Sequence, residues 1–297
     1  MSGAWLLLPD FGLILLGQLL RRVMHLGDHF WSGLERLVYY VLFPALLFNA
    51  LARAPIDFAA TAPLVFTALA TLLTGAALGL LARPLFRQQP MVFASQFQCA
   101  FRYNSYIGLA VAAKLHGGEG IATMGIIVGT MVPIANLLSV WMLARHGNLG
   151  LLRELARNPL ILATLAGLVW NASGAPLPDL LQQFVGRLAE ASIALGLLAV
   201  GAALKLRGEP GSHRAGIYFT AVKLLVLPAV AWLLGRYLGL TEIHFETVVL
   251  FAALPTATSA YILAVRMGGD GPGVAWLVSA STLTAMLTLP LWLTLIR

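Results

Sequence analysis

The stretch "CAFRYNSYIGLAVAAKL", residues 99–115, places a charge and a polar run inside an apolar segment. Arg102, Asn104 and Ser105 interrupt residues that otherwise suit a membrane-spanning helix. An arginine at the centre of such a helix costs about 2.5–3.5 kcal/mol on insertion scales. A membrane segment that carries this cost predicts a functional site, and the rest of the sequence shows which kind.

Composition places the whole chain in a lipid bilayer. The 297 residues are 59% hydrophobic and only 10% charged, whereas ordinary soluble domains carry about 25% charged residues. The net charge of +7 comes from short basic clusters between apolar runs, which mark membrane topology and predict no nucleic-acid partner. Cys99 is the single cysteine, so the sequence predicts no intrachain disulfide and no cysteine-based metal site.

The apolar runs predict an all-α integral membrane protein with ten transmembrane helices. A spanning helix needs about 20 mostly apolar residues. The runs are continuous rather than alternating, which argues against strands. Ten candidates lie roughly at residues 4–22, 33–51, 61–82, 91–115, 120–144, 159–174, 178–204, 215–238, 245–267 and 273–296.

The distribution of basic residues predicts the orientation. With the N-terminus outside, twelve Lys and Arg residues fall at inner loops and helix ends, and four at outer ones. Positive residues concentrate on the cytoplasmic side. We therefore expect a multi-pass protein of the cytoplasmic (inner) membrane with both termini outside.

The two halves of the chain resemble each other. Residues 66–85 and 219–238 are identical at nine of 20 positions, at an offset of 153. "NSYIGLAV" (104–111) aligns with "TSAYILAV" (258–265) at offset 154, and Pro9 aligns with Pro159 at offset 150. Chance similarity among Leu- and Ala-rich helices is the alternative. Three matches in order, with so little drift, favour an internal repeat.

The repeat predicts two units, 1–148 and 149–297, of five helices each. Because five is odd, the second copy enters the membrane from the opposite side. Inverted repeats of this kind are a frequent architecture of secondary transporters. Two copies that exchange slightly different conformations open a central site to one side and then to the other.

Segment 245–267 has its own interruption, "LPTATS". Pro255 lacks an amide hydrogen and clashes with the preceding turn, so it predicts a break in the helix. Thr256, Thr258 and Ser259 follow and can bond to the freed backbone groups. Matching breaks in segments 91–115 and 245–267 would cross near the midplane. Helix N-termini at such a crossing attract an anion.

Arg102 is then a candidate partner for a substrate carboxylate, since its guanidinium can bond in bidentate fashion. Alternatively it snorkels, or pairs with Asp10 or Glu190. Asn104 and Ser105 are predicted cavity residues, and hydrogen bonding between helices is the alternative.

Further polar residues within the spans have weaker claims. Asn49 and Asn136 are additional candidates for substrate binding, although helix-end hydrogen bonds would also explain them. Asp10 and Glu190 are the candidates for ion coupling, but Asp10 lies near the outer end. Glu190 follows Arg187 by three residues, a spacing that predicts an ion pair on one helix face.

Lys223 lies within segment 215–238. It is close enough to the inner end for its side chain to snorkel towards water.

The motifs "FRYNSYIGLA" and "ALPTATSAYILAVRMGGD", with "LERLVYYVLFPALLFNAL" (34–51), resemble the auxin efflux carrier family, the bacterial relatives of plant PIN proteins. The resemblance runs along essentially the whole chain. It implies two inverted five-helix repeats with crossed, broken helices 4 and 9. A scaffold of helices 1, 2, 6 and 7 would support a transport domain of helices 3–5 and 8–10. It also implies transport of organic anions.

Carried over by position, the family's crossover asparagine falls on Asn104, the following glycine on Gly108 and the helix-9 proline on Pro255. This chain departs from the family pattern in three respects. A proline common in helix 7 is absent, with Ser192 near its place. Ala110 stands where helix 4 often has proline, and Arg102 with Tyr103 precedes the asparagine where the family often has a small residue.

No enzyme signature is present: the sequence has no H-E-x-x-H, G-x-S-x-G or Walker A motif. We therefore expect no enzyme activity, no cofactor and no metal.

The sequence favours a secondary transporter of a small organic anion. Alternatives are a sodium-coupled symporter of the bile-acid type and a non-transporting membrane sensor. We identify no acidic residue in segment 245–267 that would help to hold sodium, which weakens the symporter alternative. A homodimer is a candidate assembly.

Overall fold

A computed structural model describes residues 3–24, 26–53, 58–144, 159–204 and 213–296. Its regular structure in these ranges is entirely helical, and each of the ten predicted segments contains helix. Six helical stretches within them are long and apolar enough to cross a membrane. They are Asp28–Arg53, Thr61–Phe86, Pro90–Ala144, Asp179–Ala203, Arg214–Tyr237 and Gly271–Ile296. The class of all-helical integral membrane protein is thereby supported.

The chain folds into two compact units that each combine distant parts of the sequence. Unit 1 consists of Met1–Thr61, Tyr106–Thr130 and Leu152–Ala203. Unit 2 consists of Ala62–Ser105, Met131–Leu151 and Leu204–Arg297. The predicted repeat boundary at 148–149 lies outside the described residues.

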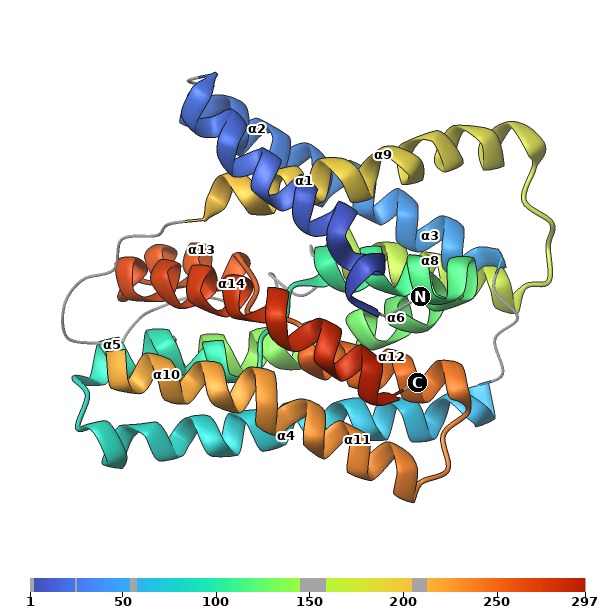
Figure 1. Ribbon diagram of the computed structural model, residues 1–297. Coiled ribbons are helices and arrows are strands. Elements are labelled where there is room, and N and C mark those ends of the chain that lie inside the picture. The colour runs from blue at the N-terminus through green and yellow to red at the C-terminus, as the bar shows by residue number, and fades with distance from the viewer. Residues whose placement is uncertain (1–2, 25, 54–57, 145–158, 205–212, 297) are drawn as a thin grey trace. The chain divides into compact units, whose positions relative to one another are not determined.

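Unit 1 is built around two pairs of neighbouring helices. Its elements are α1 (Gly3–Val23), α2 (Asp28–Leu37), the π-helix η1 (Val38–Leu42), α3 (Phe43–Arg53), the first part of α6 (Ser105–Ala144), α8 (Pro159–Ala172) and α9 (Asp179–Ala203). Helix α1 packs along α9, and α3 packs against α8 and α9 (Figure 1).

Small residues let α1 and α9 approach closely. A Cβ atom added to Gly17 would collide with the carbonyl group of Leu198, and one added to Gly201 would collide with that of Ile14. Helix pairs in membranes associate through such close backbone contact, because lipid tails leave no hydrophobic driving force between helices. The two glycines therefore fix how near α1 and α9 lie.

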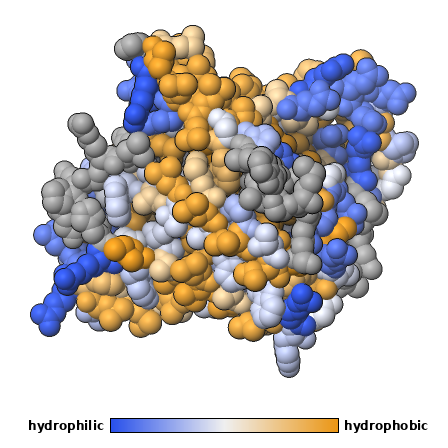
Figure 2. Space-filling model, in the orientation of Figure 1, coloured by the Kyte–Doolittle hydropathy of each residue, from blue (hydrophilic) through white to orange (hydrophobic). Residues whose placement is uncertain are grey.

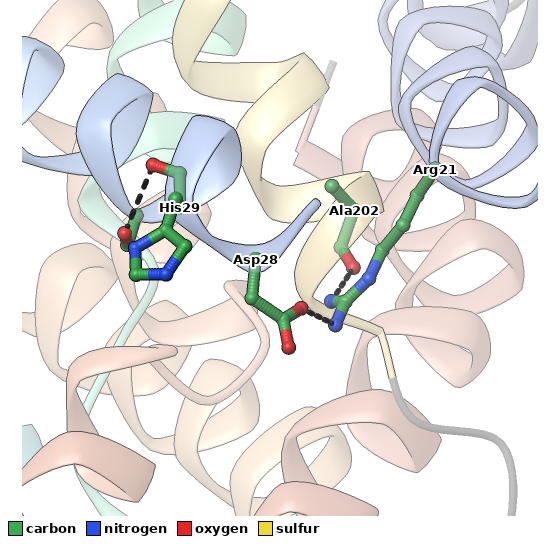
Figure 3. A network of polar contacts seen from close by, with 5 residues as sticks. Arg21, Asp28, His29 and Ala202 are labelled. Carbon is green, nitrogen blue, oxygen red and sulfur yellow. Dashed lines mark hydrogen bonds and ion pairs between the residues drawn. The ribbon is translucent and has the colours of Figure 1, made fainter. Parts of the chain in front are cut away.

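An arginine joins three helix ends of unit 1 (Figure 3). Arg21, in the last turn of α1, donates hydrogen bonds to the carbonyl oxygen of Ala202 at 2.6 Å and to Oδ1 of Asp28 at 2.7 Å. Ala202 lies at the carboxyl end of α9, where a positive charge is favourable. Asp28 is the first residue of α2, where a negative charge is favourable.

Unit 2 contains most of the remaining helices. They are α4 (Phe58–Phe86), α5 (Pro90–Phe97), the 3₁₀ turn η2 (Gln98–Ala100), the last part of α6, α10 (His213–Ala221), the π-helix η3 (Val222–Val226), α11 (Leu227–Tyr237), α12 (Glu242–Ala253), α13 (Ser259–Arg266) and α14 (Gly271–Ile296). Helix α4 lies beside α10 and α11 (Figure 1), and the hydroxyl of Tyr218 donates to the carbonyl oxygen of Leu78 at 2.7 Å.

The π-helix η3 widens the chain just before a proline. Pro228 has no amide hydrogen for the carbonyl group of Leu224, four residues earlier. The indole Nε1 of Trp292, on α14, donates to that oxygen at 2.9 Å. A side chain from a neighbouring helix thus supplies the missing hydrogen bond. A backbone carbonyl group away from water needs such a partner.

The surface suits contact with lipid. Leu283, Leu287, Leu291 and Leu295 form a stripe on α14, each spaced four residues from the next and 38–73% exposed. Figure 2 shows hydrophobic residues over much of the visible surface. Contiguous apolar surface on this scale is rare on soluble monomers, which supports the placement of the chain in a membrane.

Two glycines of α9 give a matched test of helix packing. Gly201→Ala should destabilise the protein by about 1–3 kcal/mol, because the added methyl group overpacks the contact with Ile14. Gly186→Ala should leave stability unchanged or raise it by up to about 1 kcal/mol, since nothing lies within 4 Å of its Cβ position. Thermal unfolding in detergent measures both, and equal effects would contradict this packing.

Candidate functional site

Two interruptions of helical structure meet in unit 2. After η2 the chain is non-helical over residues 101–104, and α6 begins at Ser105. After α12 it is non-helical over residues 254–258, and α13 begins at Ser259. We call these two stretches together the crossover. They coincide with the breaks expected in segments 91–115 and 245–267.

Hydrogen bonds join the two stretches directly. The backbone amide of Asn104 donates to the carbonyl oxygen of Pro255 at 2.9 Å. The hydroxyl of Thr256 donates to the carbonyl oxygen of Cys99 at 3.1 Å. The amide of Thr256 donates to the hydroxyl of Ser281, on α14, at 3.2 Å. Each break therefore finds hydrogen-bond partners in the other, or in a neighbouring helix.

Pro255 explains why α12 ends where it does. It cannot donate to the carbonyl group of Phe251, four residues earlier, and the amide of Leu254 makes a longer contact with that oxygen at 3.4 Å. The next carbonyl group, that of Ala252, accepts a hydrogen bond from Nζ of Lys223 at 2.7 Å. A buried lysine amine thus lies at the carboxyl end of the broken helix.

Arg102 lies inside unit 2 with only 8% of its surface exposed. Its guanidinium donates to Oε1 of Gln98 at 3.3 Å and to the hydroxyl of Ser259 at 2.9 Å. The amide of Gln98 in turn donates to the carbonyl groups of Ser95 and Ala260, at 3.0 and 3.1 Å. Arg102 and Gln98 both link the two broken segments, and their polar partners hold the guanidinium in place.

Close packing supports the crossover from two sides. Gly75 and Gly79 of α4 lie against the chain at Ala100, where an added Cβ would come within 3.0 and 3.1 Å of its atoms. The ring of Tyr103 meets Phe251 edge to face, with 4.4 Å between centroids. Small residues on one helix and aromatic packing on another leave the non-helical backbone buried in protein, as membrane depth requires.

Most of the predicted substrate-binding residues lie at the crossover. Asn104, Pro255 and Thr256 are buried, and Ser105, Thr258 and Ser259 are half-buried. Gly108 is buried in α6 and belongs to unit 1.

The two remaining asparagines lie outside the crossover. Asn136 is half-buried on α6 in unit 2, apart from the hydrogen bonds given above. Asn49 belongs to unit 1, where its Oδ1 is buried without a hydrogen-bond partner among the described residues.

The candidates for ion coupling lie elsewhere. The side chain of Asp10 is outside the described residues. Glu190 is on α9 of unit 1, with 73% of its side chain exposed and its Oε2 3.7 Å from Arg187. The predicted pair between these two residues is confirmed. Within the described ranges, no three His, Cys, Asp or Glu residues are grouped to hold a metal ion.

Two charged residues of unit 2 were misjudged from the sequence. Lys223 is 1% exposed and bonds to Ala252, so the expectation that it snorkels to water is wrong. Glu246 is 3% exposed on α12, within segment 245–267. That segment therefore does contain a buried acid, and the argument against sodium drawn from its absence is also wrong.

The motif "MGGD" (267–270) has a structural role at the start of α14. Oδ1 of Asp270 accepts a hydrogen bond from the amide of Gly273 at 2.9 Å, and Oδ2 accepts one from Gln96 at 2.9 Å. Gly268 has a φ of +71°, which a residue with a side chain rarely adopts. The motif turns the chain, caps α14 and ties it to α5.

Comparison with known proteins identifies the class. The sequence profile of the membrane transport protein family matches residues 143–293. A protein of Rhizobium meliloti named "Putative malonate transporter" is 28% identical over 98% of this chain and 95% of its own length. An "Uncharacterized transporter" of Methanothermobacter thermautotrophicus is 26% identical over 94% of both chains. The transporter YfdV of Escherichia coli K12, also named as uncharacterized, is 25% identical over 63% of both.

An all-helical protein with long apolar helices and two interrupted segments that meet is, on this evidence, a membrane transporter. The chain belongs to the membrane transport protein family. The resemblance to auxin efflux carriers that its motifs suggested is confirmed.

Two buried threonines test the hydrogen bonding of the crossover. Thr256→Val should destabilise the protein by about 1–3 kcal/mol, because it leaves the carbonyl group of Cys99 without its donor. Thr247→Val is the control on α12: this residue is fully buried, and its hydroxyl has no partner among the described residues. We expect that change to be neutral or stabilising, and unfolding curves that ranked the two variants in the opposite order would refute the assignment.

Proposed function

We propose that this protein is a secondary active transporter of a small organic anion, specifically a carboxylate, that works by elevator-type alternating access. The crossover carries this proposal. It places a buried arginine beside the amino-terminal ends of two helices, in a chain of the membrane transport protein family.

The chemistry of the crossover suits an anion. Helices α6 and α13 both begin there, and the amino-terminal end of a helix has a partial positive charge. Asn104 precedes α6, and Thr258 precedes α13. Arg102 adds a full charge whose planar donors match a carboxylate. The proposed substrate site thus consists of Arg102, Asn104, Ser105, Thr258 and Ser259, with Thr256, Pro255 and Gly108 shaping it.

A carboxylate of the malonate type is the first substrate to test. One relative that spans nearly the full chain is named as a malonate transporter. A dianion also suits a site that combines one guanidinium with two helix ends. Asn49 and Asn136 are proposed as further contacts, and Asp10 and Glu190 as residues of ion coupling.

The proposed architecture is that of ten helices in two inverted five-helix repeats, with scaffold helices 1, 2, 6 and 7 and a transport domain of helices 3–5 and 8–10. The grouping of the crossover with α4, α10, α11 and α14 in one unit supports a body that could move as a whole. Residues 106–130 are grouped with unit 1, where Gly125 lies against Leu47 and Gly129 against Thr164. Elevator movement would require α6 to slide along α3 and α8 at these small residues.

Substitution of Arg102 tests the substrate site. Transport of radiolabelled malonate is measured in proteoliposomes over a range of malonate concentrations. Arg102→Gln should weaken malonate binding, seen as an increase in KM, about ten- to hundredfold. The reason is that a hydrogen bond to a charged group contributes about 1.5–3 kcal/mol. Arg102→Lys should recover part of the loss, since it keeps the charge without the bidentate geometry.

Arg214→Gln is the matched control, because Arg214 is exposed on α10 and lies outside the crossover. Its transport should equal that of the unaltered protein. A folded Arg102→Gln protein with full transport would move the site elsewhere. Transport that strictly required sodium would favour a symporter of the bile-acid type, and tight binding without flux would favour a sensor.

Orientation in the membrane is testable with a reporter fused after Arg297. With both termini outside, alkaline phosphatase fused there should be active, and green fluorescent protein should be dark. The positive-inside bias of the loops is the physical reason. A fluorescent fusion would contradict the proposed topology.

A further inference from the structure

The broken end of α12 presents backbone oxygens that need a positive partner. In a continuous helix the carbonyl group of Ala252 would accept from the amide of Thr256, four residues on. That amide instead donates to Ser281. The oxygen of Ala252 is thereby released at the carboxyl end of a helix, where the dipole makes the potential negative.

Lys223 occupies this position. Its Nζ donates to the oxygen of Ala252 at 2.7 Å, and the residue is 1% exposed. It projects from η3, whose π-helical turn packs against α12 and is held to α14 by Trp292. Three elements of unit 2 therefore fix the ammonium group against the end of the broken helix.

Burial of a charged lysine side chain is energetically unfavourable. A lysine inside a membrane protein is expensive unless it is paired or bonded to backbone carbonyl groups. In secondary transporters with broken helices, carbonyl groups and carboxyl-terminal helix ends at the break are where sodium ions bind. An ammonium group is likewise a compact monovalent cation, and it is attached to the chain.

We propose that the ammonium group of Lys223 is a built-in cation for the carboxyl end of α12, in the place where a transporter of this architecture would otherwise bind a sodium ion. Its positive charge would offset the negative carboxyl end of the α12 dipole. The break in α12 then holds its shape without a dissolved ion, and the protein needs no sodium to fold.

Removal of the side chain should convert this position into a site for a dissolved cation. The full-length protein and its Lys223→Ala variant are unfolded thermally in detergent, in sodium, potassium and choline chloride at equal ionic strength. The unaltered protein should have the same Tm in all three salts. The variant should be less stable in choline, and sodium should raise its Tm by about 2–4 °C, because an ion that binds only the folded state stabilises it.

A second variant separates charge from volume. Lys223→Met keeps a side chain that matches the aliphatic stem of lysine but removes the ammonium group, so it should lower the Tm in all three salts. Lys114→Met is the control, because Lys114 is exposed on α6. Three results would overturn the proposal: a Tm for Lys223→Met equal to that of the unaltered protein, a Lys223→Ala protein that responds equally to all salts, or one that folds in none of them.

A flux measurement extends the test, and only this part rests on the proposed function. Malonate exchange by the unaltered protein should be equal in sodium and choline, while exchange by Lys223→Ala should depend on sodium. Absence of malonate exchange by the unaltered protein would count against the proposed substrate. The unfolding measurements contain no substrate, so they would still decide the role of Lys223.

Discussion

The hydrogen bond from the amide of Asn104 to the carbonyl oxygen of Pro255 depends on both interruptions being present. A polar backbone group inside a bilayer has no water to bond with, and each one left without a partner costs several kcal/mol. One broken helix alone would leave such groups exposed to lipid or to apolar side chains. Two breaks that face each other can exchange donors and acceptors.

The remaining polar contacts of unit 2 follow from the same constraint. Thr256 bonds through its hydroxyl to Cys99, and Gln98 bonds through its side chain to Ala260, so each segment also bonds to the other's backbone with a side chain. Trp292 donates to a carbonyl oxygen of η3, and Lys223 donates to a carbonyl oxygen of α12. Each of these oxygens lies a few residues before a proline. Gln98, Arg102, Lys223 and Thr256 are buried polar residues of unit 2 that lie where helices depart from regular geometry.

Features governed by local chemistry could be read from the sequence. Pro255 lacks an amide hydrogen wherever it is placed, so the end of α12 was predictable. The low share of charged residues predicted a membrane protein, and the repeat located a second break near Asn104 although that segment has no proline. The spacing of Arg187 and Glu190 predicted their pair, because residues three apart lie on one helix face.

Features that depend on how helices pack could not be predicted in the same way. Lys223 was expected to snorkel because it lies near one end of its segment. The π-helix η3 changes which residues face α12, and its position follows from no simple pattern in the sequence. Glu246 can be read directly from the sequence of segment 245–267, but its burial depends on the helices that surround α12. The partners of Arg102 also come from packing, since Ser259 is 157 residues away in the chain.

The two buried basic residues of unit 2, Arg102 and Lys223, lie beside opposite ends of helices. Lys223 bonds to a carbonyl oxygen at a helix carboxyl end, where the dipole already offsets its charge. Arg102 bonds to a hydroxyl and a side-chain amide, beside two helix amino-terminal ends that repel rather than offset a cation. A negative ligand beside Arg102 would also interact favourably with these two amino-terminal helix ends. The helix ends beside Arg102 therefore support the proposed anion site there, and the carboxyl end of α12 supports the proposed role of Lys223.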